Sequence, residues 1–153
     1  MRRTMVIILV SIAAACGCRS GGPEAPRRAE TRGVEILGPS GEVLGEVQVE
    51  VVSSPDATAR GLKYRDEVPE GTGMLFVFPE DIVRSFWMQD TRVSLDILFI
   101  DRDGGVVGIR RNTEPYSEAS ITVGVPSRYV LEVPAGTCSR KGIHRGARVV
   151  LPF

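Results

Sequence analysis

Residues 94–101 read "SLDILFID" and are followed by "RDGG" and then by "VVGIRR" at residues 106–111. Two short apolar segments on either side of an Asp-Gly-Gly turn predict a β-hairpin. Asp96 interrupts the first segment, although a half-solvated strand would alternate regularly. Since a buried carboxylate needs a partner or becomes neutral, Asp96 marks either a structural clamp or part of a site.

Outward from this hairpin, period-two alternation or short apolar runs predict further strands. These strands are expected at residues 43–51, 73–78, 82–89, 127–134 and 147–153.

A single short helix is predicted near residues 55–61. Ser54 can cap it, Pro55 suits its first position and Gly61 suits its end. Glycines near the C-terminus favour turns over further helices. We therefore expect a mainly β fold, a compact single-domain β-sandwich or irregular barrel with this one helix.

The N-terminus reads as an export signal. Arg2 and Arg3 precede an apolar run, so residues 1–15 are predicted to be a signal peptide. The sequence "AAACGC" resembles a bacterial lipobox, with Cys16 as the first choice for lipidation and Cys18 as the alternative; an ordinary cleaved signal would instead give a secreted protein. Residues 16–32 are rich in Gly, Pro and charge and predict a flexible tether, which leaves 33–153 as the globular domain.

The expected location is therefore the cell envelope, on the periplasmic face and with the outer membrane favoured, through an N-terminal lipid. Six of the 19 basic residues and two of the 19 acidic residues precede residue 33, so the domain keeps 13 basic and 17 acidic residues. A mildly acidic domain argues against nucleic acid as a partner. We expect a monomer.

Metal, cofactor and thiol chemistry have little support. "DRDGG" at residues 101–105 lacks the acidic ligands that a calcium loop needs, so it is interpreted as a turn. Cys138 stands alone in the domain, and no partnership with the only histidine, His144, can be argued from the sequence. We expect no metal and no cofactor.

Asp96 and Glu132 are the candidate catalytic residues, because both acids lie among apolar strand residues. They could form a general acid/base pair. Alternatively, each is a structural group held by backbone amides or by an arginine. Arginines available for that role are Arg60, Arg65 and Arg128.

Trp87 and Met88 are interpreted either as a ligand-binding wall or as core residues. The polar residues that follow them suggest that the strand leaves the sheet here for a loop, where function is common.

The order of the motifs resembles a known family, the domain of unknown function 192. The resemblance covers nearly all of residues 43–151, through "RGLKYR" (60–65), "GMLFVF" (73–78), "FWMQDT" (86–91), "LDILFID" (95–101), "YVLEVPAG" (129–136) and "KGIHRGARV" (141–149).

The resemblance implies a mainly β domain, often exported or lipid-anchored, without an established activity. The family pattern falls on several of the candidate residues already named and adds Thr91. The chain departs from the pattern at Lys63-Tyr64, where Met-Phe is common, and at Asp90, where Asn is common.

These observations predict a ligand site made of Arg60, Arg65, Trp87, Met88, Thr91, Asp96 and Glu132. In it, Arg65 or Arg60 would hold Asp96, Glu132 would join the same polar cluster, and Trp87 with Met88 would form its apolar wall. We expect a non-catalytic envelope domain that binds a small molecule such as a glycan, or that assists a partner. The alternatives are a hydrolase of envelope glycans that uses Asp96 and Glu132, and a protein that docks through a sheet edge.

Overall fold

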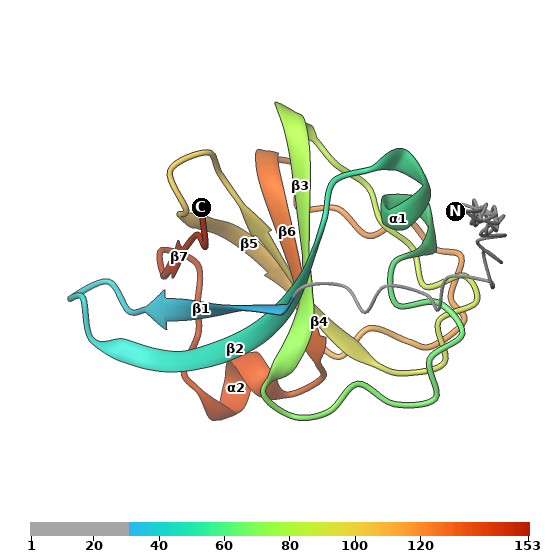
Figure 1. Cartoon of the computed structure of the whole chain (residues 1–153), viewed down its shortest axis with the longest axis horizontal. Coiled ribbons are helices and arrows are strands. Elements are labelled where there is room, and N and C mark those ends of the chain that lie inside the picture. The colour runs from blue at the N-terminus through green and yellow to red at the C-terminus, as the bar shows by residue number, and fades with distance from the viewer. Residues whose placement is uncertain (1–30) are drawn as a thin grey trace, which may run out of the picture.

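The computed structural model describes residues 31–153 and shows one curled sheet of seven strands with two short helices (Figure 1). The predicted signal peptide, Cys16, Cys18 and all but the last two residues of the predicted tether lie outside the described residues. The strands are β1 (Thr31–Leu37), β2 (Val43–Val52), β3 (Thr72–Val83), β4 (Leu95–Ile100), β5 (Val106–Arg110), β6 (Pro126–Pro134) and β7 (Arg148–Val150). The helices are α1 (Pro55–Arg60) and α2 (Thr137–Arg140).

The strand order is β5-β4-β6-β3-β2-β1-β7, and every neighbouring pair is antiparallel except β2 and β3. The sheet curls until its two edge strands meet at one end, where Gly105 bridges Arg148. Beside this bridge the Val149 N–H donates to the Gly104 carbonyl over 2.8 Å. The predicted mainly β class is confirmed, and the barrel-like form is the one observed.

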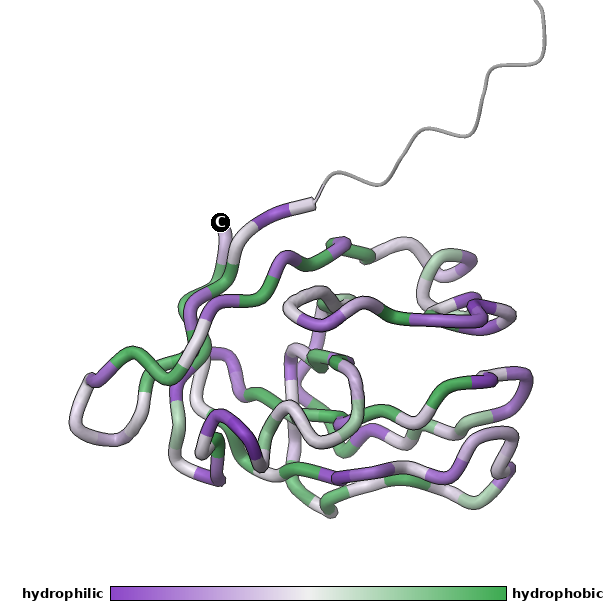
Figure 2. Tube along the Cα trace, turned by 90° about the horizontal axis from the view of Figure 1, so that it is seen from below, coloured by the Kyte–Doolittle hydropathy of each residue, from purple (hydrophilic) through white to green (hydrophobic). Residues whose placement is uncertain are grey.

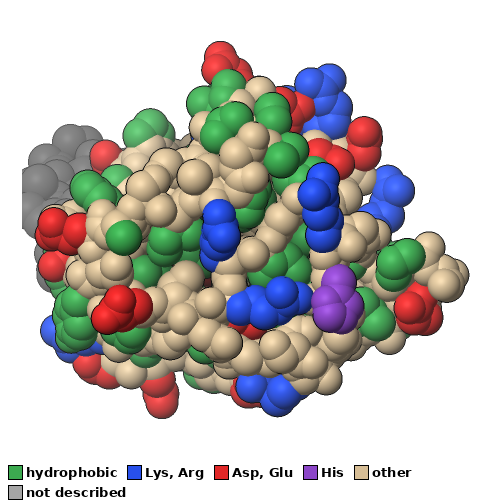
Figure 3. Space-filling view, turned by 180° about the vertical axis from the view of Figure 1, so that it is seen from behind, with side chains coloured by type: hydrophobic (Ala, Val, Ile, Leu, Met, Phe, Trp, Pro, Cys, Tyr) green, Lys and Arg blue, Asp and Glu red, His purple; other side chains and the backbone are tan. Residues whose placement is uncertain are grey.

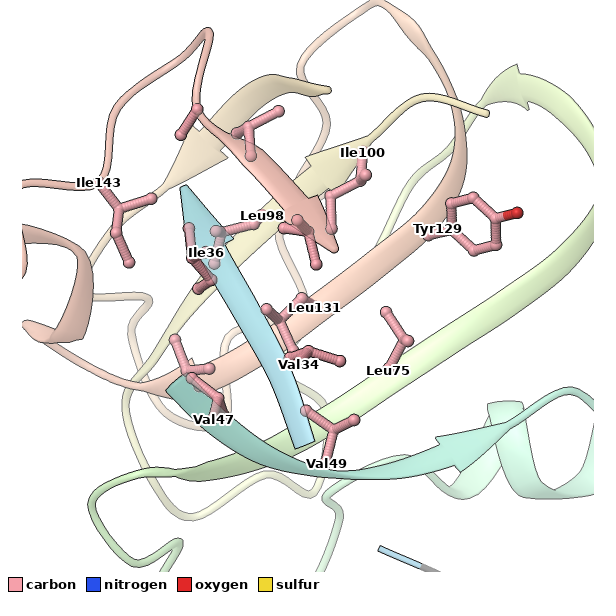
Figure 4. Close-up of a cluster of buried hydrophobic side chains, with 14 of the residues drawn as sticks. Val34, Ile36, Val47, Val49, Leu75, Leu98, Ile100, Tyr129, Leu131 and Ile143 are labelled. Carbon is pink, nitrogen blue, oxygen red and sulfur yellow. The ribbon is translucent and has the colours of Figure 1, made fainter. Parts of the chain in front are cut away.

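The inner face of the curl holds the larger hydrophobic core. Alternate residues of β1 and β2 point into it, as the period of two requires. Figure 4 shows these side chains converging from five strands, with Ile143 closing one end. Ten of them are labelled there and are at least nine-tenths buried: Val34, Ile36, Val47, Val49, Leu75, Leu98, Ile100, Tyr129, Leu131 and Ile143.

The outer face of the central strands carries a second hydrophobic cluster. It includes Met74, Phe76, Ile97 and Phe99, with Leu62 and Met88 contributed by the segments that follow α1 and β3. The hydropathy of the tube in Figure 2 switches repeatedly along the strands, which fits a sheet with two differently packed faces. This second cluster is the platform on which the candidate site is built.

The hairpin at the centre of the sequence is confirmed. β4 pairs with β5, and the Asp101 carboxylate accepts the N–H groups of Asp103 and Gly105 across the turn. Asp101 therefore serves the turn. Among residues 31–153, no group of acidic, His and Cys side chains is arranged to hold a metal ion. None of the helices in that range is long and apolar enough to cross a membrane.

The predicted strand at residues 82–89 is wrong beyond Val83. β6 begins at Pro126, which is opposite Val83, so the ladder has no further partner there. Phe86 instead makes an isolated bridge with Ile121. The apolar composition of this segment reflects its packing on the sheet, which sequence periodicity alone does not distinguish from a strand.

Three further boundaries differ from the predictions. β1 was not expected, and it begins at Thr31, so the last two residues of the predicted tether belong to the sheet. α2 forms where only turns were predicted, because Gly136 adopts a left-handed φ of 80° just before it. β7 spans only Arg148–Val150 of the predicted 147–153. The predicted helix α1 is confirmed with its cap, since the Ser54 hydroxyl accepts the Ala57 N–H.

Candidate functional site

The two candidate acids lie on neighbouring strands but on opposite faces of the sheet. In the register of β4 and β6, Asp96 is opposite Val133 and Glu132 is opposite Ile97. Cross-strand partners share a face and consecutive residues do not. Val133 belongs to the inner core, whereas Ile97 belongs to the outer cluster. The sheet therefore separates the carboxyl groups, and they cannot act together on one bond.

Asp96 is a clamp held by backbone amides, and the predicted arginine partner is wrong. Its Oδ1 accepts the Asn112 N–H and its Oδ2 accepts the Cys138 N–H, each over 2.9 Å. The side chain is fully buried. Two charge-assisted hydrogen bonds of this kind satisfy a buried carboxylate, so Asp96 ties β4 to the residue after β5 and to α2.

Cys138 lies in this clamp and is a buried, unreactive thiol. Burial, and then the charge of Asp96, raise its pKa to about 12, far from the range of a nucleophilic cysteine. The His144 ring lies elsewhere, with its Nδ1 3.3 Å from an Arg111 guanidinium nitrogen. The structure thus shows no contact between Cys138 and His144.

Glu132 faces the other way, into a cavity of about 300 Å³ on the outer face. We call this space the Glu132 cavity. Its lining comes mainly from α1 with the residues after it, from β3 and from the segment that follows β3; α1 and β3 are labelled in Figure 1. Its main aromatic and aliphatic walls are Leu62, Phe76, Phe78, Ile82, Phe86 and Trp87.

Glu132 is a buried residue, 5% exposed, whose carboxyl group has no side-chain hydrogen bond or ion pair within residues 31–153. Its carboxyl oxygens are not fully enclosed by protein, since the enclosed side-chain atoms without a partner in that range are Asp81 Oδ1 and Ser127 Oγ. Loss of hydration alone raises its pKa to about 8. The group is therefore mostly protonated at neutral pH, and it presents an O–H donor and a carbonyl acceptor to the cavity.

The inner walls of the cavity are aromatic. The ring centroids of Phe76 and Phe86 lie 5.4 Å apart at 82°, and those of Phe78 and Phe86 lie 6.3 Å apart at 84°. Both are edge-to-face arrangements, which favour rigid packing. The sequence analysis missed these phenylalanines as site residues. Their signal was present, because Phe76 and Phe78 share the face of Met74, the cross-strand partner of Glu132.

Three cations line the cavity, and two of them already have partners. Lys63 lies 4.0 Å from Asp90 and 5.6 Å from the centre of the Trp87 ring. Arg84 stacks on Phe78 at 3.6 Å and donates to the Ser127 carbonyl. Arg60 is exposed, at the end of α1, and its guanidinium makes no hydrogen bond or ion pair with residues 31–153.

Four of the seven predicted ligand-binding residues meet at this cavity: Arg60, Trp87, Thr91 and Glu132. Trp87 is 52% exposed and stands at the rim, whereas Thr91 is buried. The other three do not reach it.

Asp96 is on the opposite face, and Met88 is a core residue that is 1% exposed. The guanidinium of Arg65 pairs with Glu50 through two hydrogen bonds of 2.6 and 2.8 Å. Met88 is directed inward because its backbone N–H donates to the Ser117 carbonyl, which sets the orientation of the segment.

Residues 36–151 match the sequence profile of the DUF192 family, described as an uncharacterized ACR. None of the curated proteins is significantly similar in sequence to this chain.

The solved structures that resemble this chain in both sequence and fold include one protein from each of two organisms. One is a Sinorhizobium meliloti 1021 protein, provisionally described as a transcription regulator, with 37% identity and a TM-score of 0.76; the match covers 80% of this chain and 94% of that one. The other is a Novosphingobium aromaticivorans protein of unknown function, with 31% identity and a TM-score of 0.74, over 79% and 85% of the two chains.

The positions at which the chain departs from the family pattern contact one another. The Tyr64 N–H donates to the Asp90 carbonyl over 2.9 Å, and the Tyr64 hydroxyl donates to the Asp90 carboxylate over 3.2 Å. Both residues have a left-handed backbone, with φ values of 64° and 58°. Asp90 thus holds a turn beside the cavity, as an Asn also could.

Proposed function

The chain belongs to the DUF192 family, and we propose that it is a non-catalytic binding domain that holds a small ligand in the Glu132 cavity. The observation that carries the proposal is the carboxyl group of Glu132, a buried residue that lines the cavity and whose side chain has no partner among residues 31–153. A buried polar group without a partner costs free energy. A ligand that accepts its hydrogen bond would recover that cost.

The composition of the walls also supports ligand binding. Small-molecule sites are mainly apolar and carry a few convergent polar groups. The Glu132 cavity has this composition, with phenylalanines inside, Trp87 at the rim and Glu132 at depth. Its volume of about 300 Å³ lies at the lower limit of typical ligand pockets.

The remaining features of the proposal come from the sequence. We propose that the domain acts as a monomer at the cell envelope, anchored through a lipid on Cys16 or Cys18. The alternative of a glycan hydrolase loses its support, because the sheet separates Asp96 from Glu132. The alternative of docking through a sheet edge is weakened by the bridge between the two edge strands.

Transcription regulation, the description given to the S. meliloti protein, is not part of this proposal. The domain of the present chain has more acidic than basic residues, and nucleic-acid binding needs a concentrated basic surface. On the face drawn in Figure 3, a few basic side chains lie near the centre beside the histidine, most acidic side chains lie toward the edges, and hydrophobic atoms are visible between them.

Native mass spectrometry of the full chain, purified from the cells that make it, tests this proposal. We expect a bound small-molecule mass that is lost on denaturation and absent from the Trp87→Ala variant. Tyr116→Ala is the matched control, because Tyr116 is equally exposed but lies outside the cavity. A bound mass that survives Trp87→Ala, or a chain that is always bare, would argue against this site.

A further inference from the structure

The charges around the Glu132 cavity are all of one sign. Among the described residues that line it, the only acid is Glu132, which is mostly uncharged at neutral pH, while Arg60, Lys63 and Arg84 are cations. A net positive lining attracts anions and repels cations. This asymmetry is local, since the domain as a whole is mildly acidic.

Arg60 is the cation that is available to a ligand. Lys63 has Asp90 and the Trp87 ring as partners, and Arg84 is held by Phe78 and by the Ser127 carbonyl. The Arg60 guanidinium has no such partner among residues 31–153, and Arg60 is an exposed residue of the cavity lining. A guanidinium fork matches a carboxylate with two parallel hydrogen bonds.

The inner walls favour a flat ring over a sugar. Phe76, Phe78 and Phe86 give aromatic faces and edges. A sugar carries several hydroxyl groups, each of which needs a partner when buried. Near these rings, Glu132 and Thr91 are the buried polar residues that line the cavity, and they are too few for a pyranose.

We infer that the ligand of this cavity is a small planar carboxylate whose acid group binds Arg60 at the rim and whose far end accepts a hydrogen bond from Glu132. This inference rests on the proposed binding function and specifies its ligand class. The aromatic body lies between the phenylalanines and Trp87. The ligand therefore carries two polar ends, one charged and one neutral, separated by an apolar ring system.

Three synthetic probes separate these contributions. 6-Acetyl-2-naphthoate has both polar ends, 6-acetyl-2-naphthamide lacks the charge, and 6-isopropyl-2-naphthoate replaces the acceptor carbonyl with an apolar group of similar shape. Trp87 is the only tryptophan in the chain, so its indole N–H gives one NMR signal at the rim. Titrations of the full chain then give dissociation constants directly.

We expect 6-acetyl-2-naphthoate to shift the Trp87 signal and to bind about tenfold more tightly than either analogue. The amide loses a charge-assisted hydrogen bond to Arg60, and the isopropyl probe leaves the Glu132 O–H without an acceptor. Arg60→Gln should weaken the carboxylate probes about tenfold and the amide less than twofold. Arg92→Gln is the matched control, because Arg92 pairs with Asp66 away from the cavity, and it should change none of the three.

Glu132 adds a pH signature that a merely structural residue would not give. Binding of the acetyl probe should weaken above about pH 8, because ionised Glu132 cannot donate and repels the carboxylate. Glu132→Gln, which stays neutral and keeps a donor, should bind equally at pH 7 and pH 9. Over the same rise in pH the affinity of the isopropyl probe should fall less, because ionised Glu132 repels its carboxylate but no hydrogen bond from Glu132 is lost.

The outcomes distinguish this inference from the proposed function. Equal binding of the amide and the acid, or an unchanged affinity in Arg60→Gln, would overturn the ligand class while leaving a binding cavity. A Trp87 shift with N-acetylglucosamine but with none of the naphthalene probes would also overturn it. If no probe shifts the Trp87 signal while the native chain still carries a bound mass, the proposed ligand class is wrong and the proposed binding function stands. If no probe shifts the signal and no bound mass is found, the ligand class and the binding function are both wrong.

Discussion

Asp96 and Glu132 are two buried carboxyl groups on adjacent strands, yet the structure treats them in opposite ways. Asp96 receives two backbone N–H groups, whereas Glu132 receives no hydrogen bond within residues 31–153 and faces a cavity. Burial is nearly equal at 0% and 5% exposure. The difference is therefore in the partners, and it indicates that a buried acid is structural when the backbone satisfies it and available when nothing does.

The largest effect is expected from removal of the satisfied acid. Asp96→Ala leaves the amides of Asn112 and Cys138 without an acceptor, and each orphaned donor costs about 1–3 kcal/mol. We expect unfolding free energy to fall by about 4 kcal/mol in urea denaturation. Asp96→Asn keeps one acceptor and should lose about half as much. A loss below about 1 kcal/mol in the alanine variant would show that Asp96 is not the clamp described here.

Glu132→Gln should raise the unfolding free energy rather than lower it, by an amount that depends on pH. The folded pKa of about 8 lies above the ordinary glutamate value of 4.5, so the folded wild type holds a proton that the unfolded chain releases. Wild-type stability therefore falls as pH rises between these values, by up to about 1.4 kcal/mol per unit.

The glutamine variant lacks this loss. Relative to wild type, its unfolding free energy should rise by on the order of 3 kcal/mol between pH 5 and pH 7 and level off above pH 8. Urea denaturation at several pH values checks this. Stability curves that run parallel would mean that Glu132 is ionised in the native protein.

The partly exposed pair of Arg65 and Glu50 gives a smaller effect with the reverse pH dependence. The hydrogen bond from Arg65 lowers the pKa of Glu50, so this stabilisation is present above the unfolded pKa and is lost as pH falls through the folded value. The side chains are 38% and 24% exposed. After allowance for solvent screening, Arg65→Gln should cost about 0.5–1 kcal/mol at pH 7, and this cost should shrink as the pH falls below 4.5. A cost that does not change with pH would assign Arg65 to packing.

The smallest change in stability is expected at Trp87. Its side chain is half exposed and stands at the rim, so Trp87→Ala should alter unfolding free energy by less than about 0.5 kcal/mol. Ligand binding should nevertheless be lost. A large loss of stability would identify Trp87 as a core residue and remove it from the site.

The sequence predicts that Asp96 and Glu132 are buried in strands, but it does not predict that they lie on opposite faces of the sheet. Alternation identified most strands, and the apolar neighbours of Asp96 and Glu132 predicted their burial. Their placement on opposite faces depends on a register between residues that are 37 positions apart in sequence, with Asp96 opposite Val133. A shift of one residue would have put both on one face, and no local pattern fixes that register.

Local signals were also misleading where tertiary partners decide the structure. Phe86, Trp87 and Met88 look like a strand, but the ladder ends at Val83 and Pro126. By contrast, β1 could have been found, because Val34 and Ile36 alternate with Gly33 and Glu35 just after the tether. The aromatic walls of the cavity could have been predicted in the same way, from which residues of β3 share one face of the sheet.

The pairing of β1 with β7 has a consequence for the connectivity of the chain. Glu35 lies opposite Val150 and Leu37 opposite Arg148, and the Arg32 guanidinium donates to the Pro152 carbonyl. β1 and β7 thus pair like the two strands of a β-hairpin, although no turn connects them. The start of the described chain lies beside its end (Figure 2). A short Asn-Gly linker from Phe153 to Thr31 would close this hairpin, so a circular permutant opened at the exposed turn around Ser40 should keep the same barrel and the same cavity.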